Sequence, residues 1–302
     1  MLAVLLLLWP LNSTLGQQPN RFGRPDAESG TIAGKIVDVS GSPAIGARVR
    51  IRGSFADIDA TTVTDASGGF EFAVQINKEG LPNLTIFADT ADGSQAACGQ
   101  PLVSDRDTTL KPLDIHLEQT SEARFTVSDT AGTAVPKARV AVQLTYPLTI
   151  GPVETDGKGK ASIRIPRSES ISSIVVWKDH EGLDYKVYEL PREQAGEFLA
   201  KKPVFPFEGG ENFTLQGASP LRVRIADTSG QPLKNALASV WFLRKSPGET
   251  SLSLSDFGNK FQATTDAAGI VPFDWFPVWQ QDTSYPILRI PSVGCVRFKR
   301  PR

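Results

Sequence analysis

The residues that most often perform catalysis or bind metal ions are few in this 302-residue chain, and they lie far apart. There are two histidines, His116 and His180, and two cysteines, Cys98 and Cys295. Their spacing gives neither a paired-histidine zinc motif nor a nucleophile beside a base. No glycine-rich phosphate loop follows an expected strand either. We therefore expect a non-enzymatic protein with no catalytic residues, no metal site and no cofactor.

Acidic residues gather in two loops, where a calcium site is the alternative to ordinary turns. Asp57, Asp59 and Asp65 are close in sequence, and a second group runs from Asp89 to Gly93. Calcium takes about six to eight oxygen ligands, and neither loop supplies an obvious full set. Aspartate also caps backbone amides in turns, and we interpret these residues in that way.

Covalent cross-links have little support in the sequence. Cys98 and Cys295 fall in different repeats of the pattern described below, so no disulfide within a repeat is expected. Lys35 lies on an expected first strand, where some β-sandwiches form a lysine–asparagine isopeptide bond. The expected closing strand, 113–118, contains no asparagine, and we expect no such bond.

The elements that position these residues are marked by one short pattern that occurs three times. Each copy has an Asp, a Gly three residues later, an Ala six residues beyond that Gly, and further on Thr-Asp-x-x-Gly. The copies are Asp38, Gly41, Ala47, Thr64, Asp65 and Gly68; Asp129, Gly132, Ala138, Thr155, Asp156 and Gly159; and Asp227, Gly230, Ala236, Thr265, Asp266 and Gly269. They recur about every 90–100 residues, the size of a small domain rather than of a solenoid repeat.

Apolar and polar residues alternate before each first Asp and again after each second Asp. The alternation predicts half-buried strands, with Asp and Gly forming the turns between them. Short strands separated by turn signals favour antiparallel β-sandwiches. The inward positions of the strand after the second Asp are expected to be Phe70, Phe72 and Val74; Ala161, Ile163 and Ile165; and Val271, Phe273 and Trp275.

Two segments of the first copy, residues 37–43 (VDVSGSP) and 64–70 (TDASGGF), resemble the carboxypeptidase regulatory-like domain. The third copy is similar at 227–232 (DTSGQP) and 265–269 (TDAAG), while the second matches mainly in register. The resemblance implies a transthyretin-like (prealbumin-like), seven-stranded Greek-key sandwich. It also implies a non-catalytic extracellular or periplasmic module, and some relatives of the fold bind carbohydrate.

Together these observations predict an all-β chain of tandem Greek-key sandwiches. The expected division is a signal peptide at 1–16, a linker at 17–29, and sandwiches at 30–118, 119–217 and 218–302. The third copy has fewer residues after its second Asp than the others, so we expect it to be incomplete. Either the sequence is a fragment of a longer protein, or a partner strand completes the sheet.

The start of the chain predicts export. An apolar run from Leu2 to Leu11 is too short for a bilayer, which needs about 20 apolar residues. Thr14 and Gly16 precede a plausible cleavage point, as in a signal peptide, although no Lys or Arg precedes the run and a retained anchor is the alternative. The balanced charge, 32 basic against 33 acidic residues, gives no attraction for nucleic acid. We expect a secreted, periplasmic or cell-surface protein with no stable membrane span after signal removal.

One apolar stripe marks a possible interaction surface. Leu237, Trp241 and Leu243 take outward offsets on the second strand of the third copy, where the first copy has arginines. An exposed stripe of this kind promotes association. We therefore expect the insertion at 246–260, C-terminal sequence missing from a fragment, or a partner to cover it.

The functional hypothesis is a structural spacer or interaction module, with another protein or a polysaccharide as partner. The alternatives are a carbohydrate-binding module using exposed aromatic rings and an accessory part of a larger enzyme or transporter.

Overall fold

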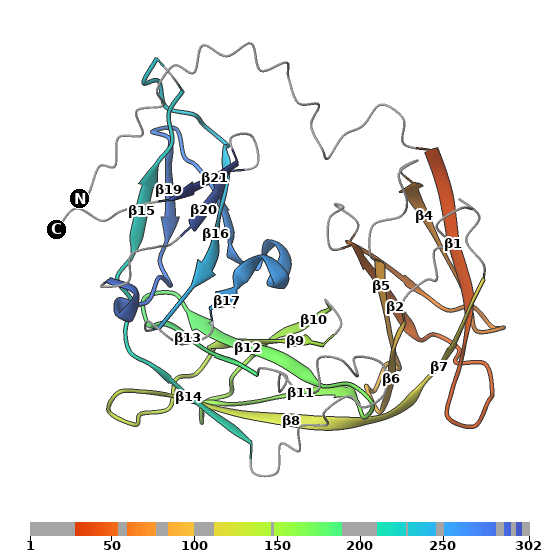
Figure 1. Ribbon diagram of the computed structural model, residues 1–302. Coiled ribbons are helices and arrows are strands. Elements are labelled where there is room, and N and C mark those ends of the chain that lie inside the picture. Colours follow the sequence, from red (N-terminus) through yellow and green to blue (C-terminus); the bar gives the residue numbers. More distant parts are fainter. Residues whose placement is uncertain are drawn as a thin grey trace, which may run out of the picture.

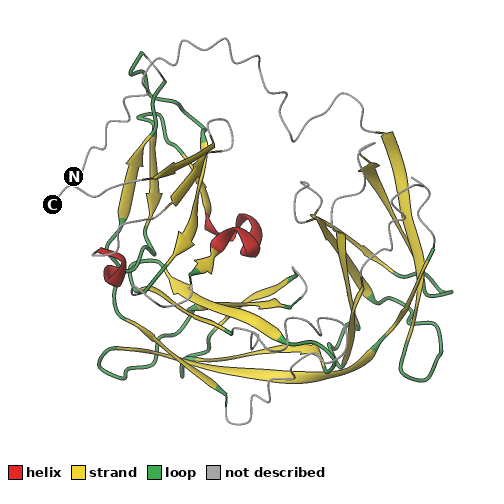
Figure 2. Cartoon of the chain, in the orientation of Figure 1, coloured by secondary structure: helices red, strands yellow, loops and turns green. Residues whose placement is uncertain are grey.

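The computed structural model describes residues 28–53, 59–76, 84–99, 112–145, 148–188, 210–227, 229–245, 251–281, 287–290 and 294–297. Within these residues the chain is all-β, with two short 3-10 helices, η2 (Leu254–Phe261) and η3 (Val278–Gln281) (Figures 1 and 2). The strands form three units along an open arc, which we call the first, second and third sandwich (Figure 1). The expected signal peptide and residues 17–27 of the expected linker lie outside the described residues.

The first sandwich consists of strands β1 to β7. One sheet has the order β4-β1-β7 and the other β3-β2-β5-β6. The strands are β1 (Glu28–Val37), β2 (Arg48–Gly53), β3 (Asp59–Val63), β4 (Gly69–Ile76), β5 (Leu84–Asp89), β6 (Gln95–Gly99) and β7 (Leu113–His116). Strand β1 thus begins two residues inside the expected linker.

The second sandwich repeats this topology with strands β8 to β14. Its sheets have the orders β11-β8-β14 and β10-β9-β12-β13. The strands are β8 (Glu118–Asp129), β9 (Arg139–Leu144), β10 (Thr149–Glu154), β11 (Lys160–Pro166), β12 (Ile171–Lys178), β13 (Gly182–Val187) and β14 (Glu211–Leu215).

The third sandwich repeats the topology in part. Strand β15 pairs with β19, and the second sheet has the order β17-β16-β20-β21, with β18 also paired to β16. Among the described residues no strand takes the place beside β15 that β7 and β14 take in the other sandwiches. The strands are β15 (Leu221–Arg224), β16 (Leu237–Leu243), β17 (Leu252–Ser253), β18 (Gln262–Thr264), β19 (Ile270–Phe273), β20 (Ile287–Ile290) and β21 (Gly294–Arg297).

The aspartates of the repeated pattern close the turns as expected. Asp38 Oδ1 accepts hydrogen bonds from the backbone N–H of Ser40 and Ser42, at 2.8 and 3.0 Å. The other five accept the same two bonds, two and four residues ahead: Asp65, Asp129, Asp156, Asp227 and Asp266. The Gly of each second turn has a positive φ, as at Gly159 (69°), where a side chain would meet the Val127 carbonyl oxygen.

The threonine before each second Asp has a structural role that the sequence pattern alone did not indicate. Thr155 is buried; its hydroxyl accepts a hydrogen bond from Ala138 N–H at 2.9 Å and donates one to the Val135 carbonyl at 2.7 Å. Thr64 and Thr265 make the same two contacts in their sandwiches. This hydroxyl fixes the chain where the next strand begins. It bonds to the Ala across 17 residues in the first two sandwiches and across 29 in the third, where the insertion lies between them.

The inward positions predicted from the alternation are confirmed. All are buried except Ala161, which is partly exposed and packs against the core of the second sandwich. The first core contains Phe70, Phe72 and Val74 together with Ile36 and Val49.

The first two sandwiches are not fully separate, contrary to expectation. Strand β6 pairs with β8 at Gln95–Gln119 and Ala96–Glu118, which joins both sandwiches in one seven-stranded sheet. The reason is local: a single residue, Leu117, separates β7 from β8. Strand β8 therefore starts while it still lies beside the first sandwich.

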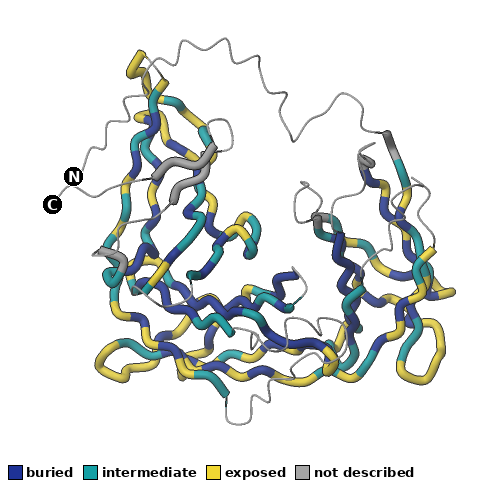
Figure 3. The backbone as a smooth tube through the Cα atoms, in the orientation of Figure 1, coloured by how far each residue is buried: buried dark blue, intermediate teal, exposed yellow. Residues whose placement is uncertain are grey.

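The second and third sandwiches share an apolar cluster. The tube of β12 is buried along most of its length (Figure 3), with a burial pattern that includes both faces. Ile174 and Val176 belong to the second core, whereas Val175 and Trp177 belong to the cluster of the third sandwich. Burial on both faces is typical of a strand that lies between two packed layers.

Candidate functional site

The structure places the three residues of the expected apolar stripe differently from one another. Leu237 is 36% exposed, Trp241 is half-buried and Leu243 is fully buried. The outward assignment of Leu243 was wrong because the register of β16 against β20 shifts between Val240 and Phe242. A bulge of one residue turns the side chains that follow it to the opposite face.

The described part of the insertion, residues 251–260, covers this stripe. Strand β17 pairs with Phe242 and Leu243, and Trp241 Nε1 donates a hydrogen bond to Ser255 Oγ at 3.0 Å. Helix η2 adds Leu254, Phe257 and Phe261, all buried, to the shared cluster. The stripe is therefore largely an internal contact, with Leu237 as its exposed end.

Trp177 and its neighbours form the main seam between the second and third sandwiches, which the sequence reading left unassigned. The rings of Trp177 and Phe261 lie 4.7 Å apart, and Phe261 also contacts Trp275 at 5.0 Å. Trp279 Nε1 donates to the Leu183 carbonyl at 2.9 Å. Four consecutive apolar residues at 174–177 were the available signal, because such a run indicates burial on both faces.

Polar contacts reinforce the same seam. Lys245 Nζ lies 2.6 Å from Asp184 Oδ1, and Lys245 N–H donates to Tyr185 Oη at 3.1 Å. Thr149 Oγ1 donates to the Asp256 carbonyl at 2.6 Å. The third sandwich is thus fixed to the second by side chains from both.

The arginines of β2 line the outer face of the first sandwich. Residues 48, 50 and 52 pair across the sheet with 89, 87 and 85 of β5. Arg48 donates to both carboxylate oxygens of Asp89, and this contact raises the pKa of the Arg48 guanidinium. Arg50 lies over the Phe87 ring, 4.8 Å from its centroid.

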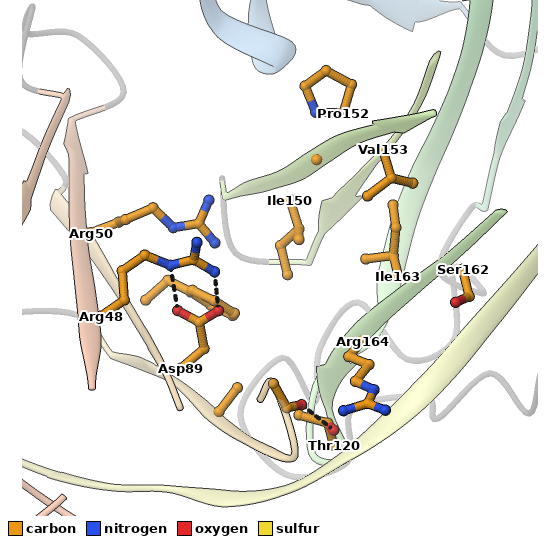
Figure 4. A pocket seen from close by; sticks show the side chains of 14 residues that line it. Arg48, Arg50, Asp89, Thr120, Ile150, Pro152, Val153, Ser162, Ile163 and Arg164 are labelled. Atoms are coloured by element: carbon orange, nitrogen blue, oxygen red, sulfur yellow. Dashed lines mark hydrogen bonds and ion pairs between the residues drawn. The ribbon is translucent and has the colours of Figure 1, made fainter. Parts of the chain in front are cut away.

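A recess of about 320 Å³ lies between this arginine face and strands β10 and β11 of the second sandwich (Figure 4). Arg48 and Arg50 point into it from one side, and Ile150, Ile163 and Arg164 lie across from them (Figure 4). Arg164 Nη1 donates to the Asp92 carbonyl at 2.6 Å. Guanidinium groups bind carboxylate and sulfate oxygens, so the recess has the chemistry to accept an acidic group.

The recess does not have the groups for nucleophilic catalysis among its described lining residues. They include neither histidine nor cysteine, and Asp89 is held by Arg48. His116 is exposed on β7, while His180 lies in the turn after β12, where its N–H donates to the Asp274 carbonyl. Within the described residues, no three His, Cys, Asp or Glu side chains are close enough to hold a metal ion.

The acidic loops behave as turns where they are described. Asp89 pairs with Arg48, and Asp92 accepts hydrogen bonds from Thr90 Oγ1 at 2.6 Å and Ser94 N–H at 3.0 Å. These bonds lower the pKa of Asp92 to about 2. Asp57 lies outside the described residues. Among the described helices, none has the length and apolar character needed to cross a bilayer.

No protein-family model matches the chain, and no curated protein matches it in sequence. Among solved structures, it is similar to the Bacillus anthracis TIE protein (13% identity, TM-score 0.23), covering 90% of this chain and 47% of that one. It is also similar to shaft pilin SpaA from Lactobacillus rhamnosus GG, with 8% identity and a TM-score of 0.22, covering 64% of this chain and 99% of that one. BcpA, the major pilin subunit of Bacillus cereus, is a further match, with 10% identity and a TM-score of 0.21, covering 87% of each chain. At such identities and TM-scores the comparison transfers neither a residue role nor a function to this chain.

Proposed function

We propose that this chain is a non-enzymatic, exported structural protein that holds its tandem sandwiches in a fixed arrangement at a cell surface or in a periplasm. The single observation that supports this role most is the packing between the sandwiches. Independent binding modules joined by linkers need no shared core, whereas here the second and third share one apolar cluster. A protein built in this way is suited to set the distance between whatever is attached to its ends.

The family assignment is part of the same proposal. The turn segments of the first and third copies resemble those of the carboxypeptidase regulatory-like domain. The strand order of the first two sandwiches, three strands facing four, agrees with a seven-stranded transthyretin-like sandwich. We infer that the three copies arose from such a domain.

The arrangement is tested by measuring the distance between the second and third sandwiches in the full chain. Spin labels at Thr126→Cys and Leu237→Cys, with Cys98 and Cys295 replaced by Ala, report this distance by double electron–electron resonance. We expect one narrow distribution. Phe261→Ala removes the ring between Trp177 and Trp275 and should broaden the distribution.

A matched control is Phe72→Ala, which removes a buried ring of the first sandwich and leaves the labelled distance unchanged. A broad distribution in the chain that carries only the labels would contradict the proposal, because the second and third sandwiches would then move independently of each other.

A second candidate function is binding of an acidic sugar in the arginine-lined recess. It is favoured over stacking on exposed aromatic rings, since no aromatic side chain is among the exposed large apolar residues that the structure describes. Titration with glucuronate, with glucose as the neutral match, tests it by calorimetry. We expect that glucuronate binds and glucose does not, and that Arg164→Gln loses the binding of glucuronate. Equal heats for the two sugars would rule this function out.

A further inference from the structure

The first and last strands of the first sandwich lie side by side and run parallel. Strand β1 pairs with β7 from Gly34–Leu113 to Val37–His116. The chain enters this sandwich at the start of β1 and leaves it at the end of β7. Because the strands are parallel, these entry and exit points lie at opposite ends of the pair.

The second sandwich has the same arrangement. Strand β8 pairs in parallel with β14 from Phe125–Glu211 to Asp129–Leu215. The chain enters at the start of β8 and leaves at the end of β14. Both sandwiches therefore pair the strand on which tension enters with the strand on which it leaves.

We propose that these two strand pairs are shear clamps, which make the first two sandwiches resistant to tension along the chain. Tension on the ends pulls the paired strands past each other along their length. All hydrogen bonds of the pair are then loaded together, whereas a pull at one end of a pair breaks them one after another. Each bond contributes only about 0.5–1.5 kcal/mol net to stability, so simultaneous loading is what gives mechanical strength.

The connection between the clamps transmits tension directly. Leu117 alone joins β7 to β8, and its N–H donates to the Val37 carbonyl at 2.8 Å. In Figure 1 the two strands follow each other without a loop. Beyond β14, Gly217 N–H donates to the Glu181 carbonyl at 3.0 Å, which holds the exit of the second sandwich against its own body.

The inference deepens the proposed structural role, since a spacer at a surface is exposed to pulling. It commits to a direction: strength is expected along the chain and not across the strand pair. This directional dependence separates a clamp from a sandwich that is merely stable.

The experiment applies force with optical tweezers to the full chain through pairs of cysteines, in a background in which Cys98 and Cys295 are replaced by Ala. Thr31→Cys with His116→Cys loads β1 and β7 in shear. Ser40→Cys with His116→Cys places both handles at the same end of the pair and peels it. Thr31, Ser40 and His116 are exposed, so the cores of the two variants are alike.

We expect a rupture force several-fold higher in the shear geometry than in the peeling geometry. The second sandwich provides an independent pair of variants: Ser121→Cys with Thr214→Cys in shear, and Ala131→Cys with Thr214→Cys in peeling. Melting temperatures without force should agree within each pair.

Equal rupture forces in the two geometries, in both sandwiches, would overturn the inference. That result would leave the proposed fixed arrangement intact, because the spin-label distances do not depend on pulling direction. Conversely, a broad distance distribution with strong directional dependence would reject the fixed spacer and keep the clamps.

Discussion

At the residue scale, the fold is held by a small set of polar groups that recurs in each sandwich. The turn aspartates satisfy two backbone N–H groups each, and the threonine hydroxyl joins two segments of backbone inside the protein. A buried backbone group without a partner is costly, so the threonine hydroxyl helps to specify where the next strand begins. The aspartates hold the exposed turns between strands in shape. Their recurrence in the same order made the repeats visible in the sequence.

The threonine contact predicts the cost of its removal. Thr155→Val keeps the shape but leaves the Ala138 N–H and the Val135 carbonyl without their partner. We expect a loss of about 1–3 kcal/mol in the free energy of unfolding, measured by urea denaturation. The control, Thr126→Val on the exposed face of β8, should stay within about 0.5 kcal/mol of the unmodified chain.

The turn aspartates predict acid sensitivity. Hydrogen bonds from Ser40 and Ser67 are the main cause of the lowered pKa of Asp38 and Asp65, and Asp92 is lowered to about 2. The unfolded chain therefore binds protons more readily than the folded one. The contribution of these groups to stability should be constant above pH of about 5 and fall as the pH drops from about 5 toward 2.

Asp92→Asn tests the sign of this effect. The variant should flatten the dependence of the unfolding free energy on pH between about 4 and 2, because one shifted group is removed. A steeper fall than in the unmodified chain would contradict the assignment.

At the element scale, the alternation of side chains fixes which face of a strand is buried until a bulge interrupts it. Strand β16 follows the expected pattern through Ala238 and Val240, both buried, and then reverses. The reversal brings Leu243 inward, and β17 pairs with this strand after the bulge. Helix η2 follows β17 directly and contacts β9 and β10 of the second sandwich.

Trp241 tests whether the stripe is an internal contact. Trp241→Arg removes the indole that donates to Ser255 Oγ and introduces a charge beside the insertion. We expect a lower melting temperature in dilute solution with no change in oligomeric state, measured by calorimetry and light scattering. Unchanged melting with loss of self-association would show an interaction surface instead. Leu237→Arg, at the exposed end of the stripe, is the control and should leave melting nearly unchanged.

At the scale of the whole molecule, the arc brings Arg52 of the first sandwich close to η2 of the third. A side chain added at Gly258 of η2 would lie 2.8 Å from Arg52 Nη2 of β2. The arginine face of the first sandwich thus reaches both neighbours, at the recess and at η2. The long side chains of arginine can bridge such a distance while packing along their stems.

This contact predicts a measurable change in shape. Arg52→Ala should broaden the distance distribution between spin labels at Val63→Cys and Leu237→Cys in the full chain lacking its native cysteines, because the first and third sandwiches lose a contact. Arg124→Ala is the matched control, since Arg124 pairs only with its neighbour Glu122 among the described residues. An unchanged distribution in Arg52→Ala would show that the seven-stranded sheet and the seam at Trp177 set the arc without this contact.

The sequence by itself determined the local structure of this protein. The spacing of Asp, Gly and Thr and the alternation of apolar residues predicted the turns, the repeat of the sandwich and the buried positions, because each depends on hydrogen bonds and side-chain directions within a copy of the repeat. The same reasoning predicted the absence of a catalytic motif, which stays a prediction.

Only the tertiary structure decided how the sandwiches meet. The pairing of β6 with β8 and the seam at Trp177 depend on which faces come together across more than one copy. The inward turn of Leu243 depends on the register between β16 and β20. Alternation shows that a face is apolar, but the partner that buries it lies far away in sequence. The arginine face could be read from β2 alone, while the recess exists because β10 and β11 of the next sandwich stand opposite it.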